Sequence, residues 1–318
     1  MKKIIIQLFI FLGLAFLVAI VTIVGSNKWV SEKANFKIET NPQSIVIGHS
    51  HVCYAFNDSL IDDFKNMAAT GESSFYTYQK AKRLILHNKG IKNIFVVFTN
   101  SQITKVANDA IWSDMYLADR YPKYAPFMST DDLSLVAFNN PKGFLSIQNE
   151  SVKRNFKFIR KGDDDYIKNN DIGGFVYLIK DSLRFGKRSP LAKERNTTYS
   201  TITTSYVQKI IALCKSNNIN VYLIRTPLNI EYNGLYNEDK FQEIVRTTFA
   251  GQDFLDFKNF PCKEHEFGDQ EHLNYKGAQR FSIFFNSLLK NGFLDSLDKQ
   301  KVIEDEIKRE MSISQINQ

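Results

Sequence analysis

The chain has 318 residues, 43% of them hydrophobic, and a net charge of +7. This much apolar material, with 26 Phe, is enough for a packed core and excludes an intrinsically disordered chain. The charge is modest and its basic residues are spread out, which favours ordinary solvated faces over attraction to an anionic membrane or polymer. No nucleic-acid partner is expected for a domain that an N-terminal apolar segment would hold outside the cytoplasm. Cys53, Cys214 and Cys262 form no CxxC pair, so neither a disulfide framework nor a zinc motif is expected.

Residues 4–25 form an apolar run with only Gln7 and Thr22 as polar interruptions. Because an α-helix needs about 20 apolar residues to cross a bilayer, we expect residues 1–25 to be a retained signal anchor that binds the chain to the membrane. A cleaved signal peptide is the alternative, but the small-residue site at its end is poor. Lys2 and Lys3 should hold the short end in the cytoplasm. The sequence therefore predicts a single-pass cell-membrane protein whose C-terminal domain is extracytoplasmic.

Strand and helix patterns alternate through most of the remaining chain. We expect a polar linker over residues 26–41, an α/β domain over 42–294 and a charged, helical or frayed tail over 295–318. A first helix is expected to open near residues 57–59. Strands separated by helices pair in parallel and are covered on both faces, so the fold class is α/β. The expected strands are residues 44–47, 66–69, 93–98, 220–225 and 253–256, and the later helices are residues 73–88, 203–216, 237–249 and 276–289.

The pattern becomes irregular and aromatic over about residues 101–198. A structureless loop of this length is uncommon in a compact domain. We therefore expect an insertion with helices of its own, which could act as a lid or face a partner. Its rings, among them Trp112 and Tyr116, could stack on sugars, although such rings more often belong to a core.

Two short segments carry the chemistry. The first is a buried strand that ends at Gly48 and delivers Ser50; the second places Asp269 three residues before His272. These are the three residue types of a nucleophilic triad: a hydroxyl, an imidazole that takes its proton and a carboxylate that orients the imidazole. Active sites of open α/β sheets lie at the carboxyl ends of the strands, where both segments are predicted. We expect Ser50, His272 and Asp269 to be catalytic.

Other polar groups are predicted at the same sheet edge. The backbone N–H groups of Ser50 and Gly71, with the side-chain amide of Asn100, could donate hydrogen bonds to an oxyanion. His49 and His51 flank the serine and could line the site. A metal held by His49, His51 and His272 lacks a carboxylate ligand, so no metal is expected. The reaction needs no cofactor.

Four blocks of the sequence resemble the SGNH/GDSL hydrolase superfamily. Gly48-His49-Ser50-His51 resembles the Gly-Asp-Ser nucleophile block, and Asp269 to His272 resembles the Asp-x-x-His block. Residues 66–71 and Thr99-Asn100 are similar to the glycine and asparagine blocks. The resemblance covers about residues 44–289, without the insertion. It is closest to the membrane-anchored extracytoplasmic branch that includes the D-alanylation D-proteins and alginate-acetylation-like proteins.

This resemblance implies a flavodoxin-like three-layer α/β/α sandwich with a mostly parallel sheet. It also implies a serine esterase or O-acyltransferase that acts on an acylated cell-surface glycan or similar polymer. Two positions depart from the family: His49 replaces the usual Asp, and Ser101 follows Asn100 where the family has Asp. A catalytically silent subunit of the same fold, which binds or assembles with an integral-membrane acyltransferase, is the alternative.

Overall fold

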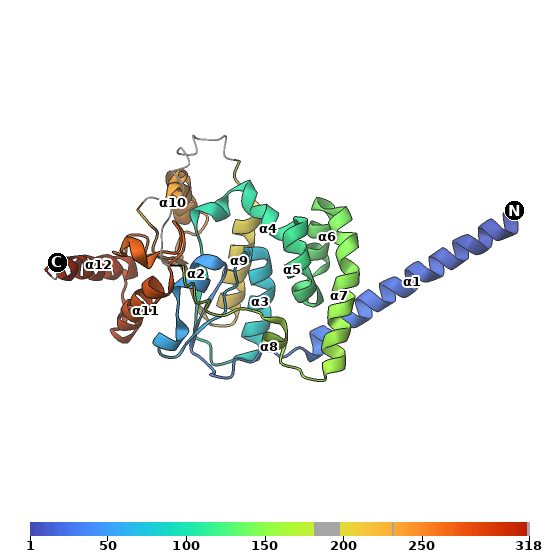
Figure 1. The fold of residues 1–318 in the computed structure, drawn as a ribbon, viewed down its shortest axis with the longest axis horizontal. Coiled ribbons are helices and arrows are strands. Elements are labelled where there is room, and N and C mark those ends of the chain that lie inside the picture. The colour runs from blue at the N-terminus through green and yellow to red at the C-terminus, as the bar shows by residue number, and fades with distance from the viewer. Residues whose placement is uncertain (181–197, 231, 317–318) are drawn as a thin grey trace. The chain divides into compact units, whose positions relative to one another are not determined.

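The protein is described by a computed structural model that covers residues 1–180, 198–230 and 232–316 (Figure 1). It divides into two compact units. Unit 1 comprises Met1–Phe36 and Ile111–Asp171, and unit 2 comprises Lys37–Ala110 and the described residues from Ile172 onward. Each unit has its own packing and is considered separately.

Unit 2 contains a five-stranded sheet in the order β2-β1-β3-β4-β5, with every pair parallel. This is the flavodoxin-like strand order. The chain places β2 on one side of β1 and then β3, β4 and β5 on the other side, so the order in which strands are added reverses between β1 and β3. The three central strands, β1, β3 and β4, are rich in β-formers and largely buried on both sides, as is typical of parallel sheets. The predicted α/β fold class is confirmed. The strands are β1 (Ser44–Ile47), β2 (Phe64–Asn66), β3 (Asn93–Val97), β4 (Asn220–Arg225) and β5 (Phe254–Asp256).

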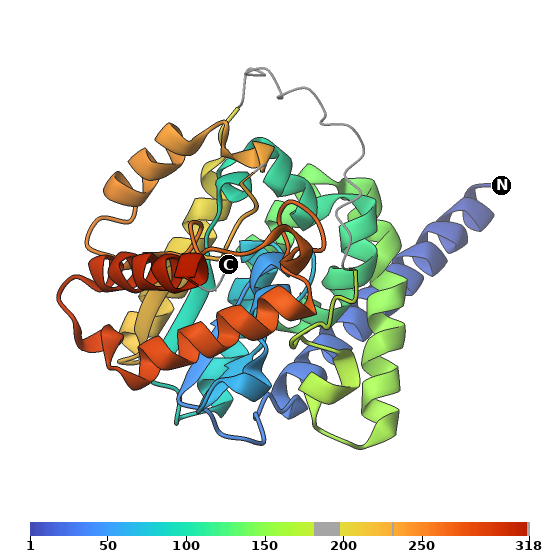
Figure 2. The same cartoon turned by 60° about the vertical axis from the view of Figure 1, so that its left-hand side comes forward.

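Alternate side chains of the strands face two helical layers. Val46, Phe95 and Tyr222 point into one cluster with Phe285 of α11 and Ile303 of α12; α11 and α12 lie on the near side in Figure 2. On the other face Phe98 stacks on Phe241 of α10, and α9 packs on β4 and α3. The layers use α2 (Ser50–Ala55), α11 (Tyr275–Lys290) and α12 (Lys299–Ile316) on one face, and α3 (Ser74–His87), α9 (Thr201–Ser216) and α10 (Glu238–Thr247) on the other.

Unit 1 is helical and includes the end of the apolar N-terminal helix. Asn155 donates from Nδ2 to Ser26 Oγ at 3.1 Å and to Asn27 Oδ1 at 2.7 Å, and Trp29 packs edge-on against Phe158. The insertion therefore has helices of its own, as expected, and they pack against the first helix. The helices are α1 (Lys2–Lys33), α4 (Asp109–Trp112), α5 (Asp114–Tyr124), α6 (Thr130–Asn139), α7 (Pro141–Lys161) and α8 (Tyr166–Asn170), with α4 crossing the boundary between the units.

Three expectations about individual segments need correction. The expected linker from residue 26 is helical as far as Lys33, because Ser26 and Val30 are buried in unit 1. The first helix of unit 2 starts at Ser50 rather than near residue 57, where a single 3₁₀ turn lies. The second strand is Phe64–Asn66, and residues 67–69 continue from it as a loop. The charged tail is helical, one of the two forms expected: it forms α12, which is anchored by the buried Ile303 and Ile307.

We predict that Ile303→Ala lowers the free energy of unfolding by about 2–4 kcal/mol, because it leaves a cavity in the core cluster. Urea unfolding of the full chain in detergent micelles, followed by circular dichroism, measures this. The control is Ile283→Ala on α11, whose side chain is 53% exposed, and it should change stability by less than about 0.5 kcal/mol. Equal effects of the two variants would contradict the packing of α12.

Candidate active site

The nucleophile turn depends on Gly48, the residue that follows β1. Its φ is +133°, a conformation that favours glycine, and a Cβ there would lie 2.0 Å from Cγ1 of Val97. The chain can therefore pass close to β3 and turn directly into α2. Ser50, the first residue of α2, is thereby held at the carboxyl edge of the sheet, between β1 and β3.

The structure brings Ser50, His272 and Asp269 together as the sequence predicts. Ser50 Oγ lies 2.7 Å from His272 Nε2, and His272 Nδ1 lies 2.9 Å from both carboxylate oxygens of Asp269. In this order the imidazole accepts at Nε2 from the serine hydroxyl and donates at Nδ1 to the carboxylate. The arrangement has the connectivity of a Ser-His-Asp triad.

The loop before α11 fixes the carboxylate of Asp269. Its Oδ1 accepts the backbone N–H of Glu271 at 2.8 Å and of His272 at 2.9 Å. Burial raises the pKa of Asp269, but the hydrogen bond and charge of His272 and these backbone donors outweigh it, so the pKa is lowered. Asp269 is therefore an anion that holds the His272 ring in place.

A second pair joins the same two segments. His51, only 3% exposed, places Nε2 3.2 Å from Glu271 Oε2. Burial lowers the pKa of His51, whereas the hydrogen bond from His51 lowers the pKa of Glu271. The neighbours of the nucleophile and of the base are thus linked to each other. Sequence analysis missed Glu271; its position one residue before His272 was the only signal.

One group of side chains has the composition of a metal site. One ligand atom each from His51, Glu271 and His272 lies within 4.8 Å of the others. Glu271 supplies the carboxylate that the histidines lacked in the sequence reading. However, His272 Nε2 contacts Ser50, so a metal bound through that nitrogen would remove the base from the serine. That no metal is needed stays a prediction.

His49 directly precedes Ser50, at the position for which the sequence resemblance implies an Asp. Its Nδ1 lies 3.5 Å from the N–H of His51, and its Nε2 lies 3.4 Å from Thr99 Oγ1. Its pKa is well below the ordinary value, chiefly through burial and then through the nearby His51. A neutral imidazole therefore replaces a carboxylate beside the nucleophile, where it caps α2 and contacts the loop after β3.

Two backbone N–H groups near Ser50 Oγ have no acceptor within the described part of the chain. They belong to Ser50 and Gly71. The loop that carries Gly71 is held against the nucleophile turn by a hydrogen bond of 2.9 Å from Ala69 N to Gly48 O. Glu72, next to Gly71, pairs at 2.8 Å with the fully buried Lys80. That the N–H groups of Ser50 and Gly71 together bind an oxyanion stays a prediction.

Asn100 has a different position from the one predicted for an oxyanion donor. Its Nδ2 donates to Asn237 Oδ1 at 3.2 Å and to Glu238 Oε2 at 2.7 Å, and its Oδ1 accepts from Arg225 at 2.7 Å. Both amide hydrogens are therefore committed elsewhere, and none remains for an oxyanion in this arrangement. Asn100 belongs to a buried charge network because it follows β3, directly beside the charged end of β4.

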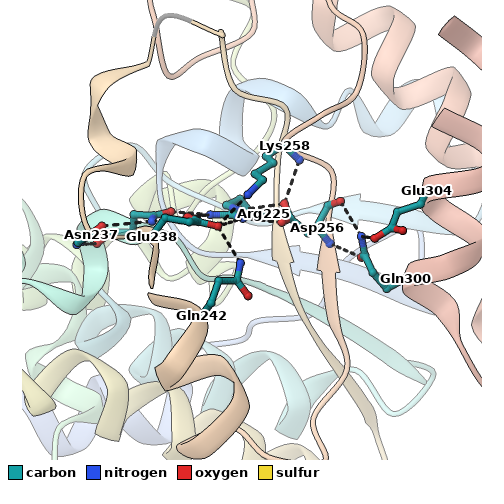
Figure 3. Close-up of polar contacts among 9 residues, drawn as sticks. Arg225, Asn237, Glu238, Gln242, Asp256, Lys258, Gln300 and Glu304 are labelled. Carbon is teal, nitrogen blue, oxygen red and sulfur yellow. Dashed lines mark hydrogen bonds and ion pairs between the residues drawn. The ribbon is translucent and has the colours of Figure 1, made fainter. Parts of the chain in front are cut away.

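The centre of this network is Arg225, the fully buried last residue of β4 (Figure 3). Its guanidinium contacts Glu238 at 2.7 and 2.9 Å and also pairs with Asp256, the last residue of β5. Lys258 adds a contact of 2.8 Å to Glu238. Burial opposes ionisation of Glu238, but these hydrogen bonds dominate and lower its pKa strongly. The signal in the sequence was a charged residue at the end of an apolar strand.

Comparisons with known proteins add little to this geometry. A protein-family model matches residues 176–294, less than half of the chain, and no curated protein matches. Three solved structures are similar at TM-scores of 0.35 to 0.38. At these scores they carry no argument about the fold or activity, which rest on the strand order and the site.

The three structures come from bacteria. A protein from Streptococcus pneumonia, assigned as a platelet activating factor, is 13% identical, with 91% of this chain and 98% of that chain covered and a TM-score of 0.38. A protein from Bacteroides fragilis that is described as an acylhydrolase is 9% identical. The match covers 83% of this chain and 93% of that chain, with a TM-score of 0.35. A GDSL-like lipase from Bacteroides thetaiotaomicron is 7% identical, with 85% and 99% covered and a TM-score of 0.36.

We predict that Glu238→Gln makes stability less dependent on acid. Because the folded-state pKa of Glu238 lies below its ordinary value of 4.5, the group stabilises the fold above that pH and loses this contribution as the pH falls toward the folded-state pKa. The variant should lose about 3 kcal/mol at neutral pH and show a flatter stability curve in acid. Urea unfolding from pH 7 to pH 3 measures both. The exposed Glu243→Gln should follow the wild-type curve; a parallel curve for Glu238→Gln would refute the role of Glu238.

Proposed function

We propose that this chain is a membrane-anchored, extracytoplasmic serine esterase or O-acyltransferase of the SGNH/GDSL type. The observation that carries the proposal is the short contact between Ser50 Oγ and His272 Nε2, with Asp269 on the other ring nitrogen. The flavodoxin-like strand order supports it. Ser50 follows β1, where the order of strand addition reverses, and open α/β sheets bind their ligands at this point.

The geometry defines the order of the chemical steps. His272 takes the Ser50 proton at Nε2 while Oγ attacks the acyl carbonyl, and the charge of Asp269 stabilises the imidazolium that forms. The N–H groups of Ser50 and Gly71 bind the oxyanion of the tetrahedral intermediate. Its collapse breaks the ester bond, and the leaving alcohol takes the proton from His272. Water or a second hydroxyl then attacks the Ser50 ester and gives its proton to His272. The bond between the acyl carbon and Oγ breaks, Oγ takes that proton back from His272, and the acyl group leaves as an acid or a new ester.

The location and substrate are further parts of the proposal. Among the residues that the structure describes, α1 alone is long and apolar enough to cross a membrane. We place α1 in the cell membrane, with the α/β unit on the outer side, where Lys2 and Lys3 direct it. The resemblance of the motif blocks supports an acylated cell-surface glycan as substrate and an integral-membrane acyltransferase as a partner.

We predict that Ser50→Ala abolishes covalent labelling by a fluorophosphonate probe and lowers aryl acetate turnover by on the order of 10⁵-fold or more, because the nucleophile is removed. The full chain in detergent is suitable for both measurements. The matched control is Ser216→Ala, an exposed serine at the end of α9, which should label and turn over like wild type. If wild type neither labels nor turns over, and Ser50→Ala restores surface modification in cells, the silent binding or assembly subunit becomes the better description.

We predict that Asp269→Asn lowers kcat by roughly 10³–10⁴-fold with little change in KM, since the neutral amide no longer stabilises the imidazolium. Steady-state turnover of the aryl acetate measures the two constants. Asp131→Asn, at an exposed carboxylate on α6, should behave like wild type. A KM effect alone would mean that Asp269 only shapes the loop.

A further inference from the structure

Three large apolar side chains are exposed at one end of unit 1. Met115 is 69% exposed, Phe138 86% and Leu145 71%. They lie at the start of α5, the end of α6 and the start of α7, and we call them the apolar corner. Asn140 joins these ends, because its Nδ2 donates to Trp112 O at 2.7 Å and to Asp114 Oδ1 at 2.8 Å. The apolar corner is therefore one connected feature rather than scattered single residues.

The packing of α7 on α1 shows which way this corner faces. Asn155 contacts Ser26 and Asn27, Phe158 contacts Trp29, and Asn35 N donates to Asp164 O at 2.7 Å, so the two helices run in the same direction. From Asn155 back to its start at Pro141, α7 extends by about 21 Å. It extends toward the side on which α1 carries its apolar run, although the two helices diverge (Figure 1).

The charge of α7 fits the same surface. The helix has six basic residues and one acidic residue, Glu150. Lys142, Lys157 and Arg160 are exposed on the face that also carries Leu145 and Phe156. A helix with exposed apolar residues and a basic face is suited to the boundary between head groups and acyl chains of an anionic bilayer. Isolated exposed apolar residues are normal, but a group on the bilayer side of an anchored unit is not.

We propose that the apolar corner lies in the head-group layer of the same bilayer that α1 crosses, with Lys142, the basic residue of α7 nearest the corner, toward anionic lipid. The proposal rests on the proposed anchoring of the chain by α1. The proposal gives the insertion a role that is separate from catalysis. The insertion binds the membrane surface beside the anchor. The occupant is lipid, so the contact forms without any partner protein.

The two tryptophans of the chain provide the test. Trp29 lies on α1 just beyond the apolar run, and the half-buried Trp112 is joined to the corner through Asn140. The full chain is reconstituted into vesicles of phosphatidylcholine and phosphatidylglycerol, with or without bromine near the head-group end of the acyl chains. Trp29→Phe reports Trp112 alone, and Trp112→Phe reports Trp29 alone.

We expect the brominated lipid to quench about half of the Trp112 emission, because an indole at head-group depth is within reach of the bromines. Phe138→Glu combined with Leu145→Glu, in the Trp29→Phe background, should remove most of this quenching. The control Leu297→Glu, at a fully exposed leucine of unit 2, should leave it unchanged. Circular dichroism establishes that each variant is folded.

Each of the other outcomes refutes either the corner contact or the anchoring by α1. Quenched Trp29 with unquenched Trp112 leaves the anchoring in place and refutes the corner contact, which points to a protein partner for this surface. Quenched Trp112 that is unaffected by the double Glu variant also refutes the corner as the contact. If neither tryptophan is quenched and alkaline carbonate releases the chain from vesicles, the anchoring by α1 fails and the corner contact fails with it.

Discussion

The candidate site depends on the close approach of Gly48 to Val97. A side chain at residue 48 would collide with β3, and the positive φ at that residue turns the chain into α2 within two residues. The serine hydroxyl thus meets a histidine that lies more than two hundred residues later in the sequence. If this approach were opened by an ångström, the hydrogen bond to the base would be lost.

The carboxyl edge of the sheet has two halves with different roles. After β1, His49 and Ser50 are half-buried, and within the described residues the N–H groups of Ser50 and Gly71 have no protein acceptor, so they are free to bind a reacting carbonyl. At β3, β4 and β5 the groups are paired with each other around Arg225. A buried guanidinium is tolerated only when its hydrogen bonds are satisfied, so this half is fixed in one arrangement. The fixed half supports the loops that border the reactive half.

Two histidines, His49 and His51, flank the serine of the candidate site. Burial lowers the pKa of both His49 and His51, so it favours their neutral forms, whereas the pKa values of Asp269 and Glu271 are lowered in favour of the carboxylates. A neutral ring beside the nucleophile adds no repulsion to the imidazolium that forms on His272 during reaction. Glu271 meanwhile holds His51, so the loop of the base is attached to the nucleophile turn at two points.

The sequence alone determined the strand–helix alternation, the apolar run of α1 and the triad residues, because these follow from periodicity and from residue types at strand ends. Only the tertiary structure decided the role of Asn100, since its amide is claimed by Arg225 and Glu238 from distant segments. The same holds for Glu271 and for the helical end of α1, which is stabilised by contacts with Asn155 and Phe158 rather than by local pattern. Secondary structure depends mainly on neighbouring residues and can be predicted from them. The burial and the partners of a side chain depend on distant segments that only folding brings together.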